Sequence, residues 1–112
     1  MRMISLAVLG LLAGQIPAQA QSADGAHIVT SGSAGGAMAC VSCHGANLMG
    51  NPAIKAPQLA GKPASYILAR LAHYASPEGH NALMKAVATA LTPPEQQAVA
   101  VYLEHLKPQP GP

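Results

Sequence analysis

Cys40-Val41-Ser42-Cys43-His44 is the stretch of sequence that decides the fold. Its two cysteines are the only ones in the 112-residue chain, and a histidine directly follows the second. In a helical turn, residues three apart lie on the same face. The spacing is that of a covalent haem attachment site, where both thiols form thioethers and the histidine binds the iron axially. The motif therefore predicts Cys40 and Cys43 as haem-attachment residues and His44 as the proximal iron ligand.

Three other interpretations of the motif have weaker support. A disulfide between Cys40 and Cys43 would close a loop so short that it would stabilise the fold only weakly. A thioredoxin-like redox site would need a βαβ setting, and the sequence has no strand signal. A zinc site would need further ligands, but His73 and His80 have six residues between them, whereas zinc ligand pairs usually have about three to five.

The N-terminal residues 1–20 have the features of a cleaved secretory signal peptide. Arg2 supplies the positive charge, residues 4–12 are apolar, and Ala18-Gln19-Ala20 forms a small-residue cleavage site. We therefore expect export to the periplasm and no membrane span after cleavage. Retention of the segment as an N-terminal anchor is the alternative.

The composition leaves a small domain short of bulky apolar side chains. The chain has no Phe, no Trp and only 3 Tyr. Domains of this size usually need bulky residues, disulfides or a metal for stability, and a buried porphyrin would supply the missing apolar volume. The formal net charge is +2, and it falls to +1 once Arg2 is removed. This balance favours neither nucleic acid nor an anionic membrane surface as a partner.

Hydrophobic periodicity and capping residues predict an all-α domain. Helices are expected over 24–31, at the haem motif, over 64–74, over 82–90, and from Thr92 to just before Pro108, with a loop over 45–62. The last start is the clearest, because Thr92 as N-cap and Glu95 at N3 form a capping box. The expected buried stripes are Ile67, Leu71 and Tyr74, then Met84, Val87, Ala88 and Leu91, and finally Val99, Tyr102, Leu103 and Leu106.

An electron-transferring haem needs a second axial ligand from the far side of the ring. The candidates remote from the motif are Met84, His27, His73, His80 and His105, whereas Met38 and Met49 are too close to it in sequence. Met84 begins a short helix after a loop that contains glycine and asparagine and could fold over the ring. Met84 is the predicted distal ligand. His80 is the alternative, and bis-histidine ligation would lower the reduction potential.

The stretch from Cys40 to Leu106 resembles the class I c-type cytochromes, particularly small bacterial periplasmic ones and the single-haem halves of dihaem relatives. The matching segments are, in order, CVSCHG at 40–45, APQLAGK at 56–62, SYILARL at 65–71, NALMKAVATALT at 81–92 and EQQAVAVYLEHL at 95–106. The resemblance implies four to five short helices wrapped around one covalently bound haem c within residues 21–107. Residues 108–112 are rich in proline and glycine and are expected to be a disordered tail.

The resemblance also implies roles for individual residues. His44 and Met84 would be the two iron ligands, and the carbonyl of Pro57 would accept a hydrogen bond from Nδ1–H of His44. Tyr66 and Arg70 occupy positions that contact haem or its propionates in relatives. Two departures concern the surroundings: the N-terminal segment has no aromatic partner for Tyr102, and Lys62 replaces a common glutamine.

The function implied by the resemblance is electron transfer, not catalysis. The protein would be a monohaem periplasmic carrier that exchanges single electrons with transient redox partner proteins. Its haem edge would open near Val41, the 45–56 loop and the loop before Met84, where small residues allow close approach. Two alternatives are a cytochrome subunit of a larger dehydrogenase or oxidase, and a haem sensor or peroxidase with an open distal site.

Overall fold

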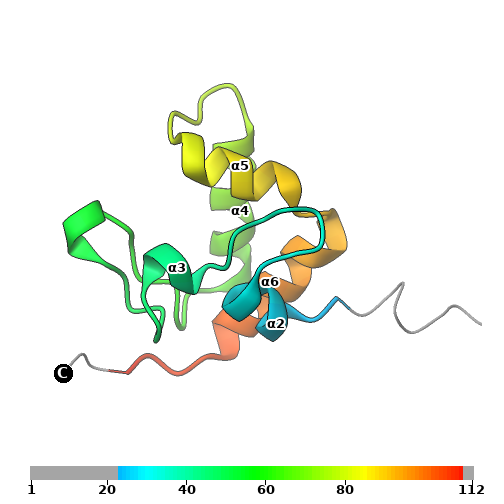
Figure 1. Cartoon of the computed structure of the whole chain (residues 1–112). Helices are drawn as coiled ribbons and strands as arrows, with labels where there is room; N and C mark the ends of the chain where they lie inside the picture. Colours follow the sequence, from blue (N-terminus) through cyan, green and yellow to red (C-terminus); the bar gives the residue numbers. More distant parts are fainter. Residues whose placement is uncertain (1–22, 110–112) are drawn as a thin grey trace, which may run out of the picture.

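A computed structural model describes residues 23–109 of the chain. This part is helical and contains no β-strand, only an isolated bridge between Asn51 and Ala56. The predicted all-α class is therefore confirmed. The helices in Figure 1 are α2 (Gly25–Ser31), α3 (Val41–His44), α4 (Ala64–Ala75), α5 (Ala82–Ala90) and α6 (Pro93–His105), with a short 3-10 helix η1 (Pro52–Ile54).

The predicted signal peptide, residues 1–20, lies outside the described residues, as do residues 110–112 of the predicted tail. Residues 107–109 have no regular secondary structure. Within residues 23–109, no helix has the length and apolar character needed to cross a membrane.

Local capping residues fix the starts of three helices. The Asp24 side chain accepts the His27 N–H at 3.0 Å, and the Asn81 side chain accepts the Met84 N–H at 3.0 Å. At the start of α6, Thr92 and Glu95 form the predicted capping box, with both hydrogen bonds present. Each cap satisfies an N–H group that has no partner within the helix. Of the three caps, the Thr92–Glu95 box is the one that was predicted from sequence.

Helix α4 differs because its cap comes from a distant part of the chain. It follows Pro63, which has no side chain able to accept a hydrogen bond, and no local cap is present. Instead, Glu104 near the end of α6 accepts the Ala64 N–H through Oε1 at 2.6 Å. The negative carboxylate also lies at the positive end of the helix dipole, which is the favourable arrangement. The beginning of α4 therefore depends on the docking of α6.

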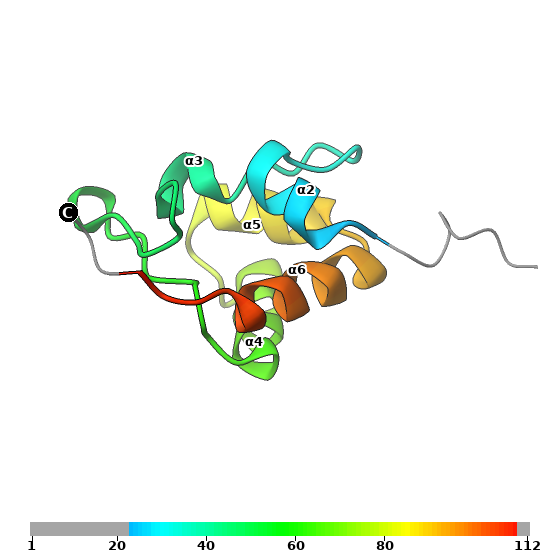
Figure 2. The same cartoon turned by 90° about the horizontal axis from the view of Figure 1, so that it is seen from below.

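Helix α6 is the centre of the packing. It contacts both α2 and α4, while α5 contacts α4, and Figure 2 shows α6 lying between α2 and α4. Of the buried side chains, Leu103 and Val29 are the largest that are almost fully enclosed. The predicted stripes are found on the core side, although Tyr74, Met84, Val87, Tyr102 and Leu106 are only partly buried. The protein side chains thus form a small core beside a cavity.

Gly25 allows the close crossing of α2 and α6. A Cβ added there would overlap the backbone carbonyl of Ala98 and lie 3.0 Å from Cβ of Tyr102. In place of the aromatic partner that Tyr102 lacks, Gly25 lets the backbones of α2 and α6 approach closely beside Tyr102.

We expect Gly25→Ala to lower the free energy of unfolding by about 1–3 kcal/mol, because overpacking of a close contact costs that much. Alanine is a better helix former than glycine, so propensity alone predicts the opposite sign. Ala26 is exposed on the same helix, and Ala26→Ser serves as the matched control with little expected effect. Denaturant unfolding of the haem-loaded protein measures both, and a stabilised Gly25→Ala variant would contradict the close crossing.

Candidate functional site

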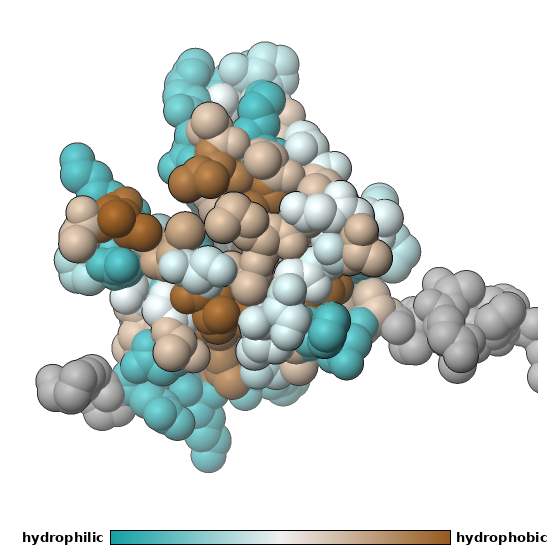
Figure 3. All heavy atoms as spheres, viewed as in Figure 1, coloured by the Kyte–Doolittle hydropathy of each residue, from teal (hydrophilic) through white to brown (hydrophobic). Residues whose placement is uncertain are grey.

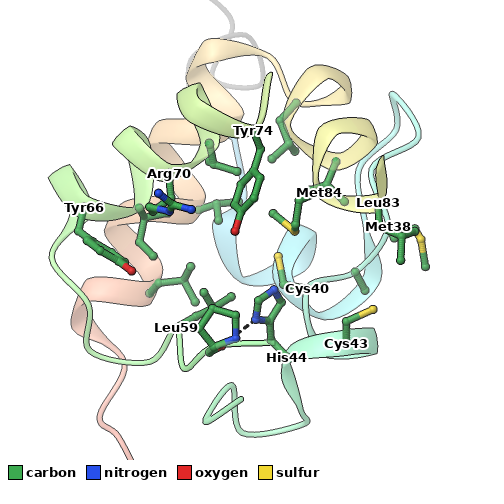
Figure 4. A pocket seen from close by; sticks show the side chains of 18 residues that line it. Met38, Cys40, Cys43, His44, Leu59, Tyr66, Arg70, Tyr74, Leu83 and Met84 are labelled. Carbon is green, nitrogen blue, oxygen red and sulfur yellow. Dashed lines mark hydrogen bonds between the residues drawn. The ribbon is translucent and has the colours of Figure 1, made fainter. Parts of the chain in front are cut away.

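An apolar cavity opens between the Cys40–His44 motif and helices α4, α5 and α6. The empty space inside it, together with the solvent at its open mouth, is about 830 Å³, and its lining is mostly apolar, as is usual for cofactor sites. Figure 4 shows the motif on one side and α5 on the other, with α4 closing the cavity between them. The lining brings together all the predicted site residues: Cys40, Cys43, His44, Pro57, Tyr66, Arg70 and Met84.

His44 is buried and held by a single backbone carbonyl. Its Nδ1 lies 2.8 Å from the carbonyl oxygen of Pro57, drawn as a dashed line in Figure 4. Because a carbonyl only accepts, Nδ1–H must donate, and this fixes the neutral tautomer with the lone pair on Nε2. The side chain is 7% exposed, the only polar one in the buried core of the described residues. An imidazole held in this way is suited to binding a metal through Nε2.

The loop that carries Pro57 is shaped by local backbone contacts. The Gly50 N–H donates to the His44 carbonyl at 2.8 Å, and Gly50 has φ +98°. A Cβ on Gly50 would lie 2.8 Å from the Ala56 carbonyl oxygen, so this position favours glycine. Helix η1 begins after Asn51, whose side chain accepts the Ala53 N–H at 3.1 Å. The predicted 45–62 loop omitted η1, although Asn51-Pro52 is a sequence signal for a helix start.

The two cysteines are free thiols and are partly buried. Figure 4 shows the Cys40 sulfur pointing into the cavity between His44 and Met84, while the Cys43 sulfur points toward the rim. Burial raises the pKa of the Cys40 thiol to about 11. In this folded arrangement the Cys40 thiol would therefore stay protonated near neutral pH and be a poor nucleophile.

Met84 lies across the cavity from His44. It belongs to the first turn of α5, and its N–H is the one that Asn81 caps. The side chain is partly buried, and Figure 4 shows its thioether directed into the cavity. His80, the alternative distal ligand, is exposed and lies outside the cavity lining, as do His27, His73 and His105.

Tyr66 and Arg70 line the cavity from α4, and both are exposed toward solvent. The Arg70 guanidinium carbon lies 5.0 Å from the centroid of the Tyr74 ring. The Lys62 ammonium lies 5.9 Å from the centroid of the Tyr66 ring. Each of these two positive charges therefore lies near the face of a tyrosine ring, which is a favourable interaction for the cation. The assignment of Tyr66 and Arg70 to haem packing or propionate contact stays a prediction.

Two residues at the opposite rim were not predicted. Met38 and Leu83 line the cavity and are 49% and 58% exposed. Figure 3 shows hydrophobic surface over the first turn of α5, where Leu83 lies, and over η1. These two large side chains differ from the small residues expected at the exposed edge. The exposure of Leu83 could not be predicted from sequence, because it depends on which face of α5 packs on the core. In the structure that face carries the buried Ala88.

Comparison with known proteins identifies the family. The cytochrome c family model matches residues 22–107 of the chain. The chain belongs to the cytochrome c family. The predicted family and fold are thereby confirmed.

Relatives of this cytochrome include proteins named for thiosulfate oxidation. The chain is 42% identical over 105 residues to a thiosulfate dehydrogenase electron acceptor of Stutzerimonas stutzeri (strain A1501), covering 93% of the chain and 49% of that protein. A protein of the same name from Thiomonas intermedia (strain K12) is 42% identical over 72 residues, which are 64% of the chain and 33% of the relative. This cytochrome thus spans about half or less of the length of these relatives.

Solved structures give the same fold. Reduced recombinant cytochrome c4 from Pseudomonas stutzeri matches with a TM-score of 0.66 and 27% identity, over 74% of this chain and 46% of that one. A thiosulfate dehydrogenase from Marichromatium purpuratum matches with a TM-score of 0.71 and 30% identity, over 75% of this chain and 18% of that one.

The site of this cytochrome fits the covalently bound haem c of its family. Four side chains with the required chemistry line a cavity with apolar walls. They are two thiols, an imidazole whose tautomer is fixed and a thioether. Thioether and imidazole suit haem iron, and thiols suit covalent attachment. Among residues 23–109, no group of three or more His, Cys, Asp and Glu side chains gathers to bind another metal ion.

Proposed function

We propose that this cytochrome is a periplasmic carrier of single electrons with one haem, which Cys40 and Cys43 attach and His44 and Met84 ligate. The observation that supports this most is the placement of the braced His44 imidazole and the Met84 thioether on opposite sides of one apolar cavity. Two different ligands from opposite faces leave no open position for a substrate, which favours electron transfer over peroxidase or sensor chemistry.

The residues of the chain hold the site in one arrangement. Bound haem c supplies the one-electron chemistry of its iron. The Pro57 carbonyl keeps the proton of His44 on Nδ1 and orients the ring. Ile67, Leu71 and Leu91 form apolar walls that exclude water from the cavity. A dry site with fixed ligands needs little rearrangement when the charge on the iron changes, which suits rapid electron exchange.

The rim formed by Met38 and Leu83 is the proposed contact surface for redox partners. Both side chains line the cavity and are largely exposed, so a partner docked on them would lie beside the cofactor. A surface of this small size fits weak, transient encounters, which is usual for electron-transfer complexes.

A second candidate concerns the electron donor. Since a relative at 42% identity over 93% of the chain is named a thiosulfate dehydrogenase electron acceptor, we propose a thiosulfate-oxidising dehydrogenase as a donor. The match to part of a thiosulfate dehydrogenase structure also allows a lasting association with such an enzyme, as a cytochrome subunit.

The test is reduction of the oxidised, haem-loaded protein by a thiosulfate dehydrogenase and thiosulfate, followed by stopped-flow absorption. We expect reduction that needs both enzyme and thiosulfate, and gel filtration that separates the two proteins if the encounter is transient. Co-elution would favour the subunit alternative. Carbon monoxide binding to the reduced wild type, without loss of an axial ligand, would contradict the carrier function.

A further inference from the structure

The loop before Met84 is folded back onto the end of α4 by contacts that the haem site does not itself require. Helix α4 ends at Ala75 and is followed by Ser76, whose N–H and hydroxyl both donate to the His73 carbonyl, at 3.1 and 2.7 Å. The loop then approaches so closely that a Cβ on Gly79 would lie 2.5 Å from the Tyr74 carbonyl oxygen. The segment between α4 and α5 therefore has little room to shift.

Lys85 joins this loop to α5. Its ammonium donates to the Ser76 carbonyl at 2.9 Å, across nine positions of sequence and in a partly buried setting. That carbonyl also accepts the Gly79 N–H at 3.0 Å. The positive charge lies at the C-terminal end of α4, where the helix dipole favours a cation. One side chain thus connects the end of α4 with the first turn of α5.

Met84 immediately precedes Lys85 in the same first turn. Asn81 accepts the N–H groups of both residues, the Met84 N–H through its side chain at 3.0 Å and the Lys85 N–H through its carbonyl at 2.8 Å. The backbone of Met84 is therefore held between the Asn81 cap and the Lys85 link. The bond from Lys85 to Ser76 opposes outward motion of the first turn of α5.

We propose that Lys85 is a positioning residue for the distal ligand: by binding the Ser76 carbonyl it fixes the first turn of α5 and keeps the Met84 thioether facing His44. The proposal rests on the proposed ligation by Met84. Removing the link frees the start of α5 to move outward, and an external ligand then competes more successfully for the distal position. Conventional hydrophobic packing of α5 through Ala88 and Leu91 remains in place, so the fold itself persists.

The test is imidazole binding to the oxidised, haem-loaded protein, together with the charge-transfer band between thioether sulfur and ferric iron. We expect Lys85→Ala to bind imidazole roughly five- to tenfold more tightly than wild type, the size expected for loss of one partly exposed charge-assisted hydrogen bond. The band should weaken in the same variant. Lys85→Arg keeps a charged donor at this position and should restore much of both properties.

Lys107→Ala is the matched control, because Lys107 is exposed beyond the end of α6 and its loss changes the net charge equally. Imidazole affinity equal to wild type in Lys85→Ala would overturn the proposal, and so would an equal increase in Lys107→Ala. Denaturant unfolding identifies a merely structural role, which would lower stability and leave imidazole affinity unchanged. Met84→Ala distinguishes failure of the ligation from failure of the positioning role. If the band survives in Met84→Ala, Met84 is not the ligand. If the band is lost in Met84→Ala but Lys85→Ala behaves like wild type, only the positioning role of Lys85 is wrong.

Discussion

Met84→Ala is expected to abolish the charge-transfer band of the ferric protein and to lower its reduction potential. Alanine has no sulfur to offer the iron, and a thioether ligand favours the ferrous state. We expect a fall on the order of 0.1–0.3 V, within the range of about 0.8 V that axial ligands span. Spectroelectrochemical titration gives the potential and the band in one measurement.

Met38→Ala is the matched control for this substitution. Met38 also lines the cavity, but it lies at the exposed rim just before Cys40. Its loss should leave the band intact and shift the potential only slightly. If the band survives in Met84→Ala and disappears in Met38→Ala, the assignment of the distal ligand is wrong.

The second large effect is expected for the double substitution of Cys40 and Cys43 by alanine. Such a protein cannot attach haem covalently, and purified without added haem it should lose most of its helical circular dichroism and its cooperative thermal transition. The reason is the apolar cavity beside the motif, because without haem its buried wall residues Ile67, Leu71 and Leu91 would face an unfilled space. Total stabilities of domains are only about 5–15 kcal/mol, and loss of the largest apolar group in the core should exceed this margin.

Ser42→Ala is the control for the double substitution, because Ser42 lies between the cysteines and is exposed. It should retain covalent haem and native helicity. Native helicity with cooperative unfolding in the double variant, measured without haem, would show that the protein side chains alone form a sufficient core.

The sequence predicted those parts of the fold that depend on neighbours in the chain. The start of α6 followed from the Thr92–Glu95 capping box, whose two residues are only three positions apart. The attachment motif was equally local. The capping of α4 by Glu104 and the contact of Gly25 with α6 could not be predicted, because each joins residues that are far apart in sequence. Such contacts exist only after the helices have packed.

The candidate site shows the same division. Cys40, Cys43 and His44 were predicted from five consecutive residues. Met84 was predicted from the candidates remote from the motif, and the family resemblance then supported it. Pro57 depended on the resemblance, since the shape of a loop is not encoded in local periodicity. The exposed rim residues Met38 and Leu83 and the link from Lys85 to Ser76 were missed, because exposure and side-chain reach follow from packing.

The bond from Glu104 to Ala64 has a consequence for the order of events during maturation. A helix of 12 residues without its own cap is marginal in isolation, so we expect the α4 wall to become stable only once the C-terminal helix has been made and docked. The nascent chain is then expected to lack a preformed cavity, while the Cys40–His44 stretch is complete within five residues. Where haem is attached as proposed, we expect attachment to act on the unfolded peptide and folding to follow around the bound cofactor.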